Sequence, residues 1–352
     1  MTIIFILSSA LCIFAQSGRK KKVEEKKPEA PTQKGEYILT ESPNATPTPT
    51  KISTVNPPPP LESDDVIKIN SSLVPIPVSV TDNKTGAAVS NLLISDFQLL
   101  VNGEPEEIGE LFRSDAPVRL ALLFDNSSSV TLAREFEQKA AIKFLNKVLR
   151  PKLDRAALYS ISSSPLLEQA MTKDVKTLVR AIAGFSKPEG ATALLDGIYE
   201  ASNYLQDFVG RRVIVIVSDG QDTLSDHGFE KVVRTVQENN CQIFIVQTNE
   251  FENFKRTGTR SGSANLRALV AETRMKTLAN ETGGAVYSPV TEEELDRAFS
   301  EISAELSEQY VLGYYPETEV RDGQFRKLEV RVSSAKPVTV RARTGYYVST
   351  LK

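Results

Sequence analysis

Between residues 116 and 308 the sequence alternates short apolar runs with segments whose apolar residues recur every three or four positions. Continuous apolar runs predict strands that are buried on both faces, and the helical period predicts amphipathic helices that cover them. The predicted strands are residues 118–124, 156–161, 213–218, 242–247 and 285–287. This alternation predicts an α/β fold with a doubly wound, mainly parallel, Rossmann-like sheet.

The predicted helices have clear inward stripes. After the first strand, Leu132, Phe136, Ala140 and Phe144 recur at four-residue spacing, which places them on one helical face. Near the end of the region, Thr291 is followed three residues later by a glutamate. This spacing is typical of a capping box, so we expect a helix to begin there.

On both sides of this region the apolar period changes to two, which predicts strands. A strand at 74–80 carries Pro75 and Pro77, and it is predicted at a sheet edge because proline cannot donate to a ladder. Another at 97–101 leads into a turn, and three further runs lie at 310–315, 328–332 and 338–342. Neither set is large enough to be stable alone. We therefore predict that segments 65–115 and 309–352 pair into one small β domain.

The amino-terminal part predicts export. Residues 3–15 form an apolar run of signal-peptide length, although no Lys or Arg precedes it and a basic cluster follows at 19–22. We therefore predict a signal peptide at 1–16. Residues 17–64 are Lys/Glu-rich and then Pro/Thr-rich, which predicts a disordered tether. The expected location is periplasmic or extracellular, associated with the cell envelope, and contact of the basic cluster with a membrane stays open.

Composition narrows the classes of partner and chemistry. The 352 residues are 40% hydrophobic and 25% charged, as in globular proteins. A formal net charge of −3 gives no reason to expect nucleic acid. Of the two cysteines, Cys12 lies in the predicted signal peptide and leaves Cys241, so we expect neither an internal disulfide nor a thiolate metal cluster. The sequence does not indicate an oligomeric state.

Oxygen-bearing side chains follow the predicted strands at one edge of the sheet. Asp125, Ser127 and Ser129 come directly after strand 118–124, Asp219 follows strand 213–218, and Thr192 lies in a turn before a helical pattern. In doubly wound sheets ligands bind beyond the carboxyl ends of the strands. Carboxylate and hydroxyl oxygens suit Mg²⁺ or Mn²⁺ better than zinc or copper. The sequence therefore predicts a divalent metal site.

This pattern, Asp125-x-Ser127-x-Ser129 with Thr192 and Asp219 in that order, resembles the metal-ion-dependent adhesion site of von Willebrand factor type A domains. The resemblance covers the central region, and the flanking segments look like bacterial proteins related to this family. It implies that the two serines bind Mg²⁺ or Mn²⁺ directly, that the threonine does so in the ligand-bound state, and that one or both aspartates bind through water. A Glu or Asp side chain of a partner protein would complete the site, and exchange of ligands between loops would act as an affinity switch.

Other interpretations of these residues stay open. Serines and aspartates after a strand also cap helices, and Thr192 and Asp219 are common turn residues. One alternative is therefore a structural envelope protein with a vestigial site. Another is a metal-dependent hydrolase or phosphatase, although no nucleophile or second-metal cluster is evident. The only histidine, His227, follows Asp226 at a predicted helix start, where a surface or capping position is expected. We predict a non-enzymatic binding module.

Two further stretches have open roles. Asp222 and Thr223 follow the second strand end closely and are expected either to support the site or to be solvated. Residues 249–264, with Lys255, Arg256 and Arg260, are predicted to form a polar loop that either contacts an acidic partner or has no role. The tyrosines near the carboxyl terminus are expected to pack within the β domain.

Overall fold

The computed structural model describes residues 73–113, 116–128, 134–188, 190–259, 266–316 and 322–348. The chain divides into two units, Met1–Val66 and Ile67–Lys352, and the fold is that of the second. The predicted signal peptide and tether lie outside the described residues. No helix in the described part of the chain is long and apolar enough to cross a bilayer.

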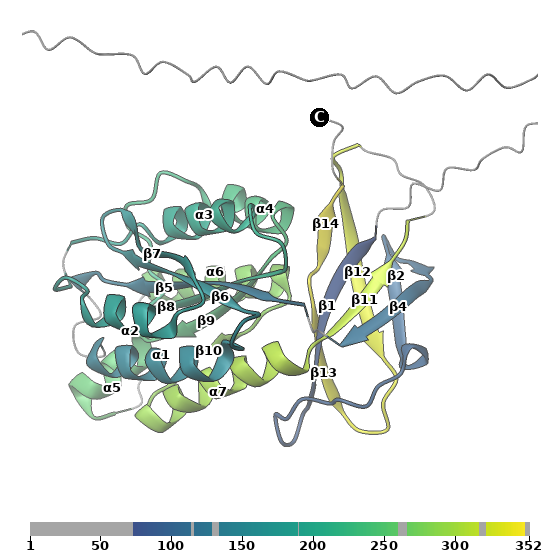
Figure 1. The fold of residues 1–352 in the computed structure, drawn as a ribbon, viewed down its shortest axis with the longest axis horizontal. Coiled ribbons are helices and arrows are strands. Elements are labelled where there is room, and N and C mark those ends of the chain that lie inside the picture. Colours follow the sequence, from purple (N-terminus) through teal and green to yellow (C-terminus); the bar gives the residue numbers. More distant parts are fainter. Residues whose placement is uncertain are drawn as a thin grey trace, which may run out of the picture. The chain divides into compact units, whose positions relative to one another are not determined.

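A six-stranded sheet forms the centre of the α/β part (Figure 1). In spatial order its strands are β10 (Val286–Tyr287), β9 (Cys241–Gln247), β8 (Arg211–Ser218), β5 (Val118–Asp125), β6 (Arg155–Ile161) and β7 (Pro165–Thr172). The first five run parallel, and β7 pairs with β6 antiparallel. The central strands are almost entirely buried, as expected for a sheet covered on both faces. The predicted doubly wound, mainly parallel fold is confirmed.

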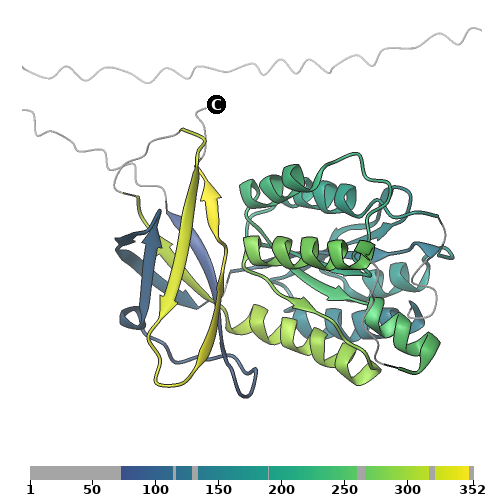
Figure 2. The same ribbon diagram turned by 180° about the vertical axis from the view of Figure 1, so that it is seen from behind.

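Helices cover both faces of this sheet (Figures 1 and 2). On one face lie α1 (Arg134–Val148), α2 (Val175–Ala183) and α7 (Glu292–Glu308), whose apolar side chains share a core with Leu120 and Leu122 of β5. On the other lie α3 (Leu194–Leu205), α4 (Phe229–Glu238) and α6 (Leu266–Thr282), which pack on Ala121 and Leu123. Alternate residues of one strand therefore serve two cores.

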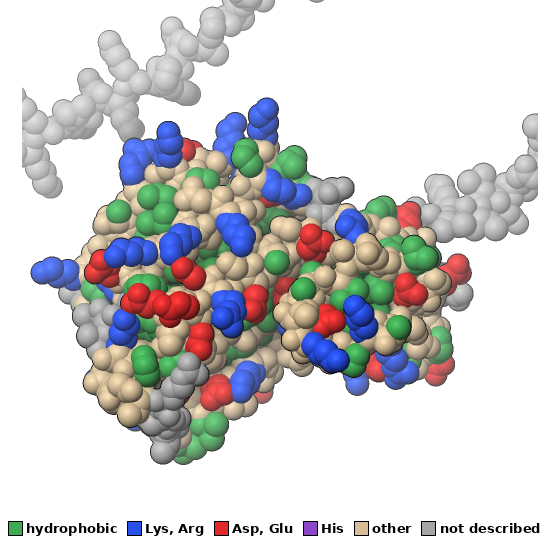
Figure 3. Space-filling view, turned by 90° about the horizontal axis from the view of Figure 1, so that it is seen from below, with side chains coloured by type: hydrophobic (Ala, Val, Ile, Leu, Met, Phe, Trp, Pro, Cys, Tyr) green, Lys and Arg blue, Asp and Glu red, His purple; other side chains and the backbone are tan. Residues whose placement is uncertain are grey.

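The surface of the α1 and α7 face carries charges of both signs. Figure 3 shows Lys and Arg side chains intermixed with Asp and Glu over this face. Some of them pair, as Lys143 does with Asp296 at 2.6 Å between α1 and α7. An extended surface of one sign, which nucleic-acid binding requires, is therefore not present on this face.

The start of α7 agrees with the sequence pattern. The hydroxyl of Thr291 accepts a hydrogen bond from the backbone N–H of Glu294 at 3.3 Å. The Glu294 carboxylate accepts in return from the backbone N–H of Val290, at 2.8 Å. The predicted helix start is confirmed, with the return bond made to the residue before the cap.

The prediction of a polar loop at 249–264 is wrong for its first part. The helix α5 spans Asn249–Thr257 and ends at Gly258, whose φ of 72° is left-handed. It forms because Phe251 is buried and packs against Phe136, at 5.8 Å between ring centroids. Basic residues in the last turn also favour a helix. Lys255 forms an ion pair with Glu292 at 2.6 Å, so its ammonium group has an acidic partner within the chain. Residues 260–265 lie outside the described residues.

Strands from both ends of the unit form two four-stranded sheets within the described residues. One has the order β13 (Val338–Ala342), β1 (Val74–Asp82), β11 (Tyr310–Tyr314) and β4 (Ile108–Arg113), and the other has β14 (Gly345–Tyr347), β12 (Phe325–Val332), β2 (Phe97–Val101) and β3 (Glu104–Glu106). A short 3₁₀ helix, Ile94–Asp96, precedes β2. Val74 lies opposite Tyr314, and Val101 lies opposite Leu328. One apolar core joins strands from before and after the α/β part.

The prediction that strand 74–80 lies at a sheet edge is wrong, because β1 has a neighbour on each side. It pairs with β11 over residues 74–78 and with β13 over residues 78–82. Pro75 and Pro77 therefore fall in the half that has only β11 beside it. Proline lacks a backbone donor, and this costs little where one side of the strand is unpaired. The predicted reason therefore holds for this half of β1, although the strand as a whole is not at an edge.

Candidate functional site

The candidate site begins where two parallel neighbouring strands end. Asp125 is the last residue of β5, and Asp219 directly follows β8. In the register of this pair Phe124 lies opposite Val217, so both aspartates are at the carboxyl edge of the sheet. Their side chains are buried, with 4% of Asp125 and 6% of Asp219 exposed. Two carboxylates are thus held together with little contact with water.

Asp125 is fixed by hydrogen bonds to both of its oxygens. The hydroxyl of Ser218 donates to Oδ2 at 2.7 Å, and the backbone N–H of Ser127 donates to Oδ1 at 2.9 Å. Burial, followed by repulsion from Asp219, raises the pKa of Asp125 to about 6, while the hydrogen bonds from the two serines oppose that rise. The carboxylate is therefore oriented by neutral donors and lies near a second negative charge.

The Thr192 loop is bonded to both aspartate loops. The hydroxyl of Ser128 donates to the carbonyl oxygen of Gly190 at 3.2 Å. On the other side, the N–H of Thr223 donates to the carbonyl oxygen of Thr192 at 2.9 Å, and the N–H of Thr192 donates to the Thr223 hydroxyl at 3.0 Å. Gly190 has a φ of 79° and no room for a Cβ, which would lie 2.7 Å from the Ser163 hydroxyl. Three loops are thereby joined at one edge.

The turn after β8 is equally specific. Gly220 has a φ of 81°, a conformation that L side chains rarely adopt, and its N–H donates to the Ser218 hydroxyl at 3.0 Å. The Asp219 carboxylate accepts from the backbone N–H of Gln221 at 2.9 Å. One carboxylate oxygen of Asp222 accepts from the N–H of Leu195, at 3.1 Å in the first turn of α3. Asp222, like Thr223, therefore fastens this turn to the Thr192 segment.

Four of the five predicted ligands belong to these joined loops, namely Asp125, Ser127, Thr192 and Asp219. All four are buried. Ser129, the fifth, lies outside the described residues. The hydrogen bonds that join the loops explain how side chains from separate segments come to the same edge.

Two residues at the site were missed by the sequence pattern. Ser218 holds Asp125, and its only signal is its place at the end of a predicted strand. Glu137 on α1 is 2% exposed, and its pKa is raised, first by burial and then by the charges of Asp125 and Glu252. Glu137 lies four residues before buried Ala141, so helical spacing could have placed it on the inward face of α1.

The donor set fits a hard divalent cation. It consists of carboxylate and hydroxyl oxygens, without nitrogen or sulfur ligands, which is the chemistry that Mg²⁺ and Mn²⁺ prefer. Over the described ranges, no three His, Cys, Asp or Glu side chains are placed to hold a metal ion. An ion here would therefore need hydroxyl ligands beside the two aspartates. The repulsion that raises the pKa of Asp125 is what a bound cation would remove.

The other candidate chemical groups lie elsewhere. His227 has its Nδ1 2.6 Å from Oδ1 of Asp196, and its ring stacks on Tyr199 with 3.9 Å between centroids. Its backbone N–H also donates to Asp196, so it serves to fix the segment before α4. Cys241 is buried, and burial raises the pKa of its thiol to about 11, as expected of an inert core cysteine.

The sequence of the site region matches a known family. Residues 120–221 match the model of the von Willebrand factor type A domain. This range runs from β5 through the loop after β8 and contains all five predicted ligands. The match and the fold identify the α/β part as a von Willebrand factor type A domain. Domains of this family are mostly non-enzymatic modules that mediate protein–protein interaction.

Likeness to solved structures is distant. The PilB minor pilin from Streptococcus sanguinis is 13% identical, with a TM-score of 0.43, over 58% of this chain and 64% of that chain. The vWF domain of the type V pili tip protein Mfa5 from Porphyromonas gingivalis is 24% identical, with a TM-score of 0.29, over 31% and 39%. BatB from Bacteroides thetaiotaomicron is 14% identical, with a TM-score of 0.40, over 53% and 97%.

This chain spans less than two thirds of the length of the two pilus proteins. No curated protein matches the chain.

Proposed function

We propose that this protein is an exported, non-enzymatic binding module that captures a Glu or Asp side chain of a partner protein through Mg²⁺ or Mn²⁺. The observation that supports this most directly is the joining of three loops by the Ser128–Gly190 and Thr192–Thr223 hydrogen bonds. These bonds bring two buried carboxylates and neutral hydroxyls to the edge where doubly wound sheets bind ligands.

In this proposal the side chains have separate roles. Asp125 and Asp219 supply negative charge, and Ser127, Ser129 and Thr192 supply neutral oxygens. The bonds from Ser218 and from the Ser127 N–H hold the Asp125 carboxylate in one orientation. A bound Mg²⁺ or Mn²⁺, with few charged ligands, would supply an electron-poor position for an incoming carboxylate. The hydroxyls of this chain thus favour an acidic partner because they leave positive charge unbalanced.

The family match supports the general part of the proposal, namely that the protein binds other proteins. The metal, the acidic partner and export are proposals from the residues. A structural protein with a vestigial site differs in having no saturable uptake of metal. A hydrolase or phosphatase differs in turning over substrate, which a screen of the purified protein with Mg²⁺ or Mn²⁺ would detect.

Affinity capture with the full chain tests the proposal. Immobilised protein is exposed to native membrane extracts with Mg²⁺, with a chelator, and with Mg²⁺ restored. We expect captured protein that is lost with the chelator and recovered with the metal. Thr192→Ala is expected to lose this capture, while Asp207→Asn, at an exposed position on the same part of the fold, retains it. Capture that is indifferent to the chelator, or unchanged in Thr192→Ala, contradicts the proposal.

A further inference from the structure

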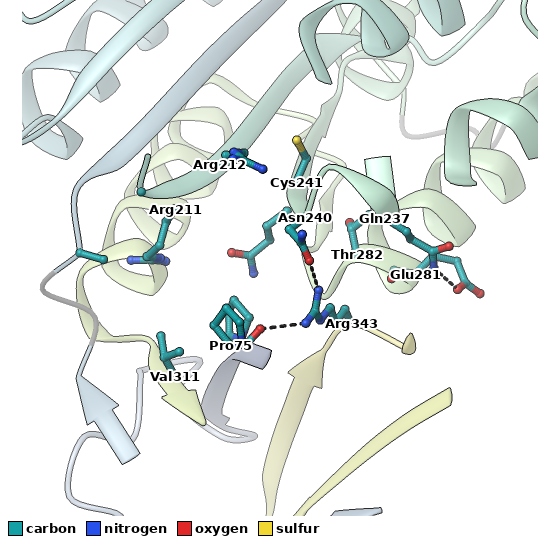
Figure 4. Close-up of a pocket in the computed structure, with 14 residues that line it drawn as sticks. Pro75, Arg211, Arg212, Gln237, Asn240, Cys241, Glu281, Thr282, Val311 and Arg343 are labelled. Atoms are coloured by element: carbon teal, nitrogen blue, oxygen red, sulfur yellow. Dashed lines mark hydrogen bonds between the residues drawn. The ribbon is translucent and has the colours of Figure 1, made fainter. Parts of the chain in front are cut away.

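A cavity of about 230 Å³ lies at the opposite end of the central sheet from the candidate metal site. Its walls come from the starts of β8 and β9 and from the β part (Figure 4). Arg211, at the start of β8, contributes from the α/β side, while Pro75, Val311 and Arg343 contribute from the β side. β8 therefore runs from this cavity to the turn that contains Asp219.

Arg211 brings a buried positive charge to this cavity. Arg211 is 9% exposed. Nη1 donates to the carbonyl oxygen of Leu306 at 2.8 Å, and Nη2 donates to the side-chain oxygen of Gln309. These neutral acceptors use two of the five N–H groups of the guanidinium. Nε has no partner within the described part of the chain. Arg211 forms no salt bridge there.

Arg343 repeats this arrangement from the other side. It is 8% exposed, and its Nη2 donates to the carbonyl oxygen of Pro75 at 2.9 Å while Nη1 donates to the Asn240 side chain. Its Nε also lacks a partner among the described residues. Burial lowers the pKa of both Arg211 and Arg343 to about 10, so both remain charged at neutral pH.

The charges around the cavity are unbalanced. Its lining contains three arginines, Arg211, Arg212 and Arg343, and one acid, Glu281, which gives three positive charges and one negative, a net of +2. The Glu281 carboxylate already accepts from the Gln237 amide at 3.0 Å and from the Thr344 hydroxyl. Arg212 donates to three backbone carbonyl oxygens. Burying guanidinium groups without a counter-charge is costly, so a bound dianion would offset it.

The arrangement of the two buried arginines selects among anions. Figure 4 shows Arg211 and Arg343 well apart on two sides of the cavity, with Pro75 between them. An anion that pairs with both must reach from one side of the cavity to the other (Figure 4). Pro75, Pro77 and Val311 supply apolar lining. A molecule with an anionic group at each end and an aliphatic middle matches this pattern, and the volume is below that of pockets for drug-sized ligands.

We propose that this cavity binds a small aliphatic dicarboxylate, one carboxylate pairing with the guanidinium of Arg211 and the other with that of Arg343. Bound in this way, the ligand bridges the start of β8 and the residue after β13, and so ties the α/β part to the β part. Planar guanidinium groups recognise carboxylates well because parallel N–H groups match the two oxygens.

Calorimetric titration of the full chain tests this proposal with succinate, glutarate and adipate as probes. Butyrate is the one-ended control, and inorganic phosphate tests whether any compact anion suffices. We expect saturable binding of at least one dicarboxylate, with butyrate and phosphate at least about tenfold weaker, the loss expected of one charged hydrogen-bonded pair. Equal binding of butyrate or phosphate, or no saturable binding of any dicarboxylate, overturns the proposal.

Variants locate the binding. Arg343→Gln and Arg211→Gln are each expected to weaken the dicarboxylate by about tenfold or more, while Arg331→Gln, at an exposed position, leaves it unchanged. Val311→Phe fills the cavity and keeps both arginines, so it separates lost binding from lost folding. Circular dichroism and urea unfolding serve as folding checks. Metal-dependent capture tests the proposed function separately, so a failure to bind dicarboxylates leaves the proposed function standing. Undiminished binding in folded Arg343→Gln and Val311→Phe overturns the assignment.

Discussion

The hydroxyl of Ser218 donates a hydrogen bond to Oδ2 of Asp125 at 2.7 Å, so the residue before one predicted metal ligand holds the other. The same hydroxyl accepts from the N–H of Gly220 at 3.0 Å. Ser218 therefore joins the end of β5 to the turn after β8. This bond orients the Asp125 carboxylate through the protein's own contacts, and it makes Ser218 a direct means of perturbing the site.

Replacing Ser218 by alanine tests that relationship. Because Ser218→Ala leaves a buried carboxylate oxygen and the Gly220 N–H without this partner, we expect a loss of about 1–3 kcal/mol in the free energy of unfolding. We also expect Mn²⁺ affinity to fall about 10–100-fold, as for other groups that orient metal ligands. Denaturant unfolding and metal titration measure the two effects. Ser334→Ala, at an exposed position, is the control, and unchanged affinity in Ser218→Ala argues against its role.

The raised pKa of Asp125 predicts the pH dependence of metal-free protein. Its folded pKa of about 6 exceeds the ordinary value of 3.8, so the folded state favours the protonated form. The contribution of Asp125 to the free energy of unfolding is fully present below about pH 4 and is lost as pH rises through 6. A shift of this size corresponds to a loss of about 3 kcal/mol.

Urea unfolding of metal-stripped protein at pH 4 and pH 7 measures this effect. Other groups titrate in the same range, so the comparison is between wild type and Asp125→Asn. We expect the variant to lack the decline that Asp125 causes, and Asp207→Asn to keep it. Identical pH profiles for wild type and Asp125→Asn would show that ionisation of Asp125 has no such cost.

Tyr310 predicts a stability effect in the β part. Its hydroxyl donates to the carbonyl oxygen of Val89 and accepts from the N–H of Leu92, each at 2.9 Å. The side chain is 2% exposed, so Tyr310→Phe leaves two backbone groups without this partner. We expect a loss of about 1–3 kcal/mol, measured by thermal and urea unfolding. Tyr315→Phe, at a more exposed tyrosine that bonds Glu110, should change stability much less.

Export is tested by the amino terminus of the mature protein. The predicted signal peptide, residues 1–16, should be absent from protein recovered in the envelope or extracellular fraction. Amino-terminal sequencing of that protein should start near Ser17. Recovery of the chain in the cytoplasm with residues 1–16 intact contradicts the predicted export.

The fold was predictable where the pattern was strong. Strands 118–124 and 213–218 are continuous apolar runs, and their burial follows from helices on both faces. Strand β7 was not predicted, because exposed Leu166 and Leu167 break any regular alternation. The prediction that β1 lies at a sheet edge was wrong because a proline indicates an unpaired side only near itself. Farther along the strand, Val78 and the residues after it pair with β13.

The candidate site was predictable as a list of oxygen donors, since Asp125 and Asp219 each end a recognisable strand. What the sequence could not give was the set of bonds that joins the loops. Nothing in the pattern distinguishes Ser218, which points at Asp125, from other serines at strand ends. Helical spacing places Glu137 on the inward face of α1, but its interaction with Asp125 depends on how α1 packs on the sheet.

Calorimetric titration of the metal-stripped full chain with Mn²⁺ and then Mg²⁺ tests directly whether the candidate site binds a divalent ion. We expect saturable uptake of one ion in the wild type and in Asp207→Asn, and its loss in Asp125→Asn and Asp219→Asn. Absence of saturable uptake in the wild type, or uptake by both site variants with the affinity of the wild type, would contradict this expectation.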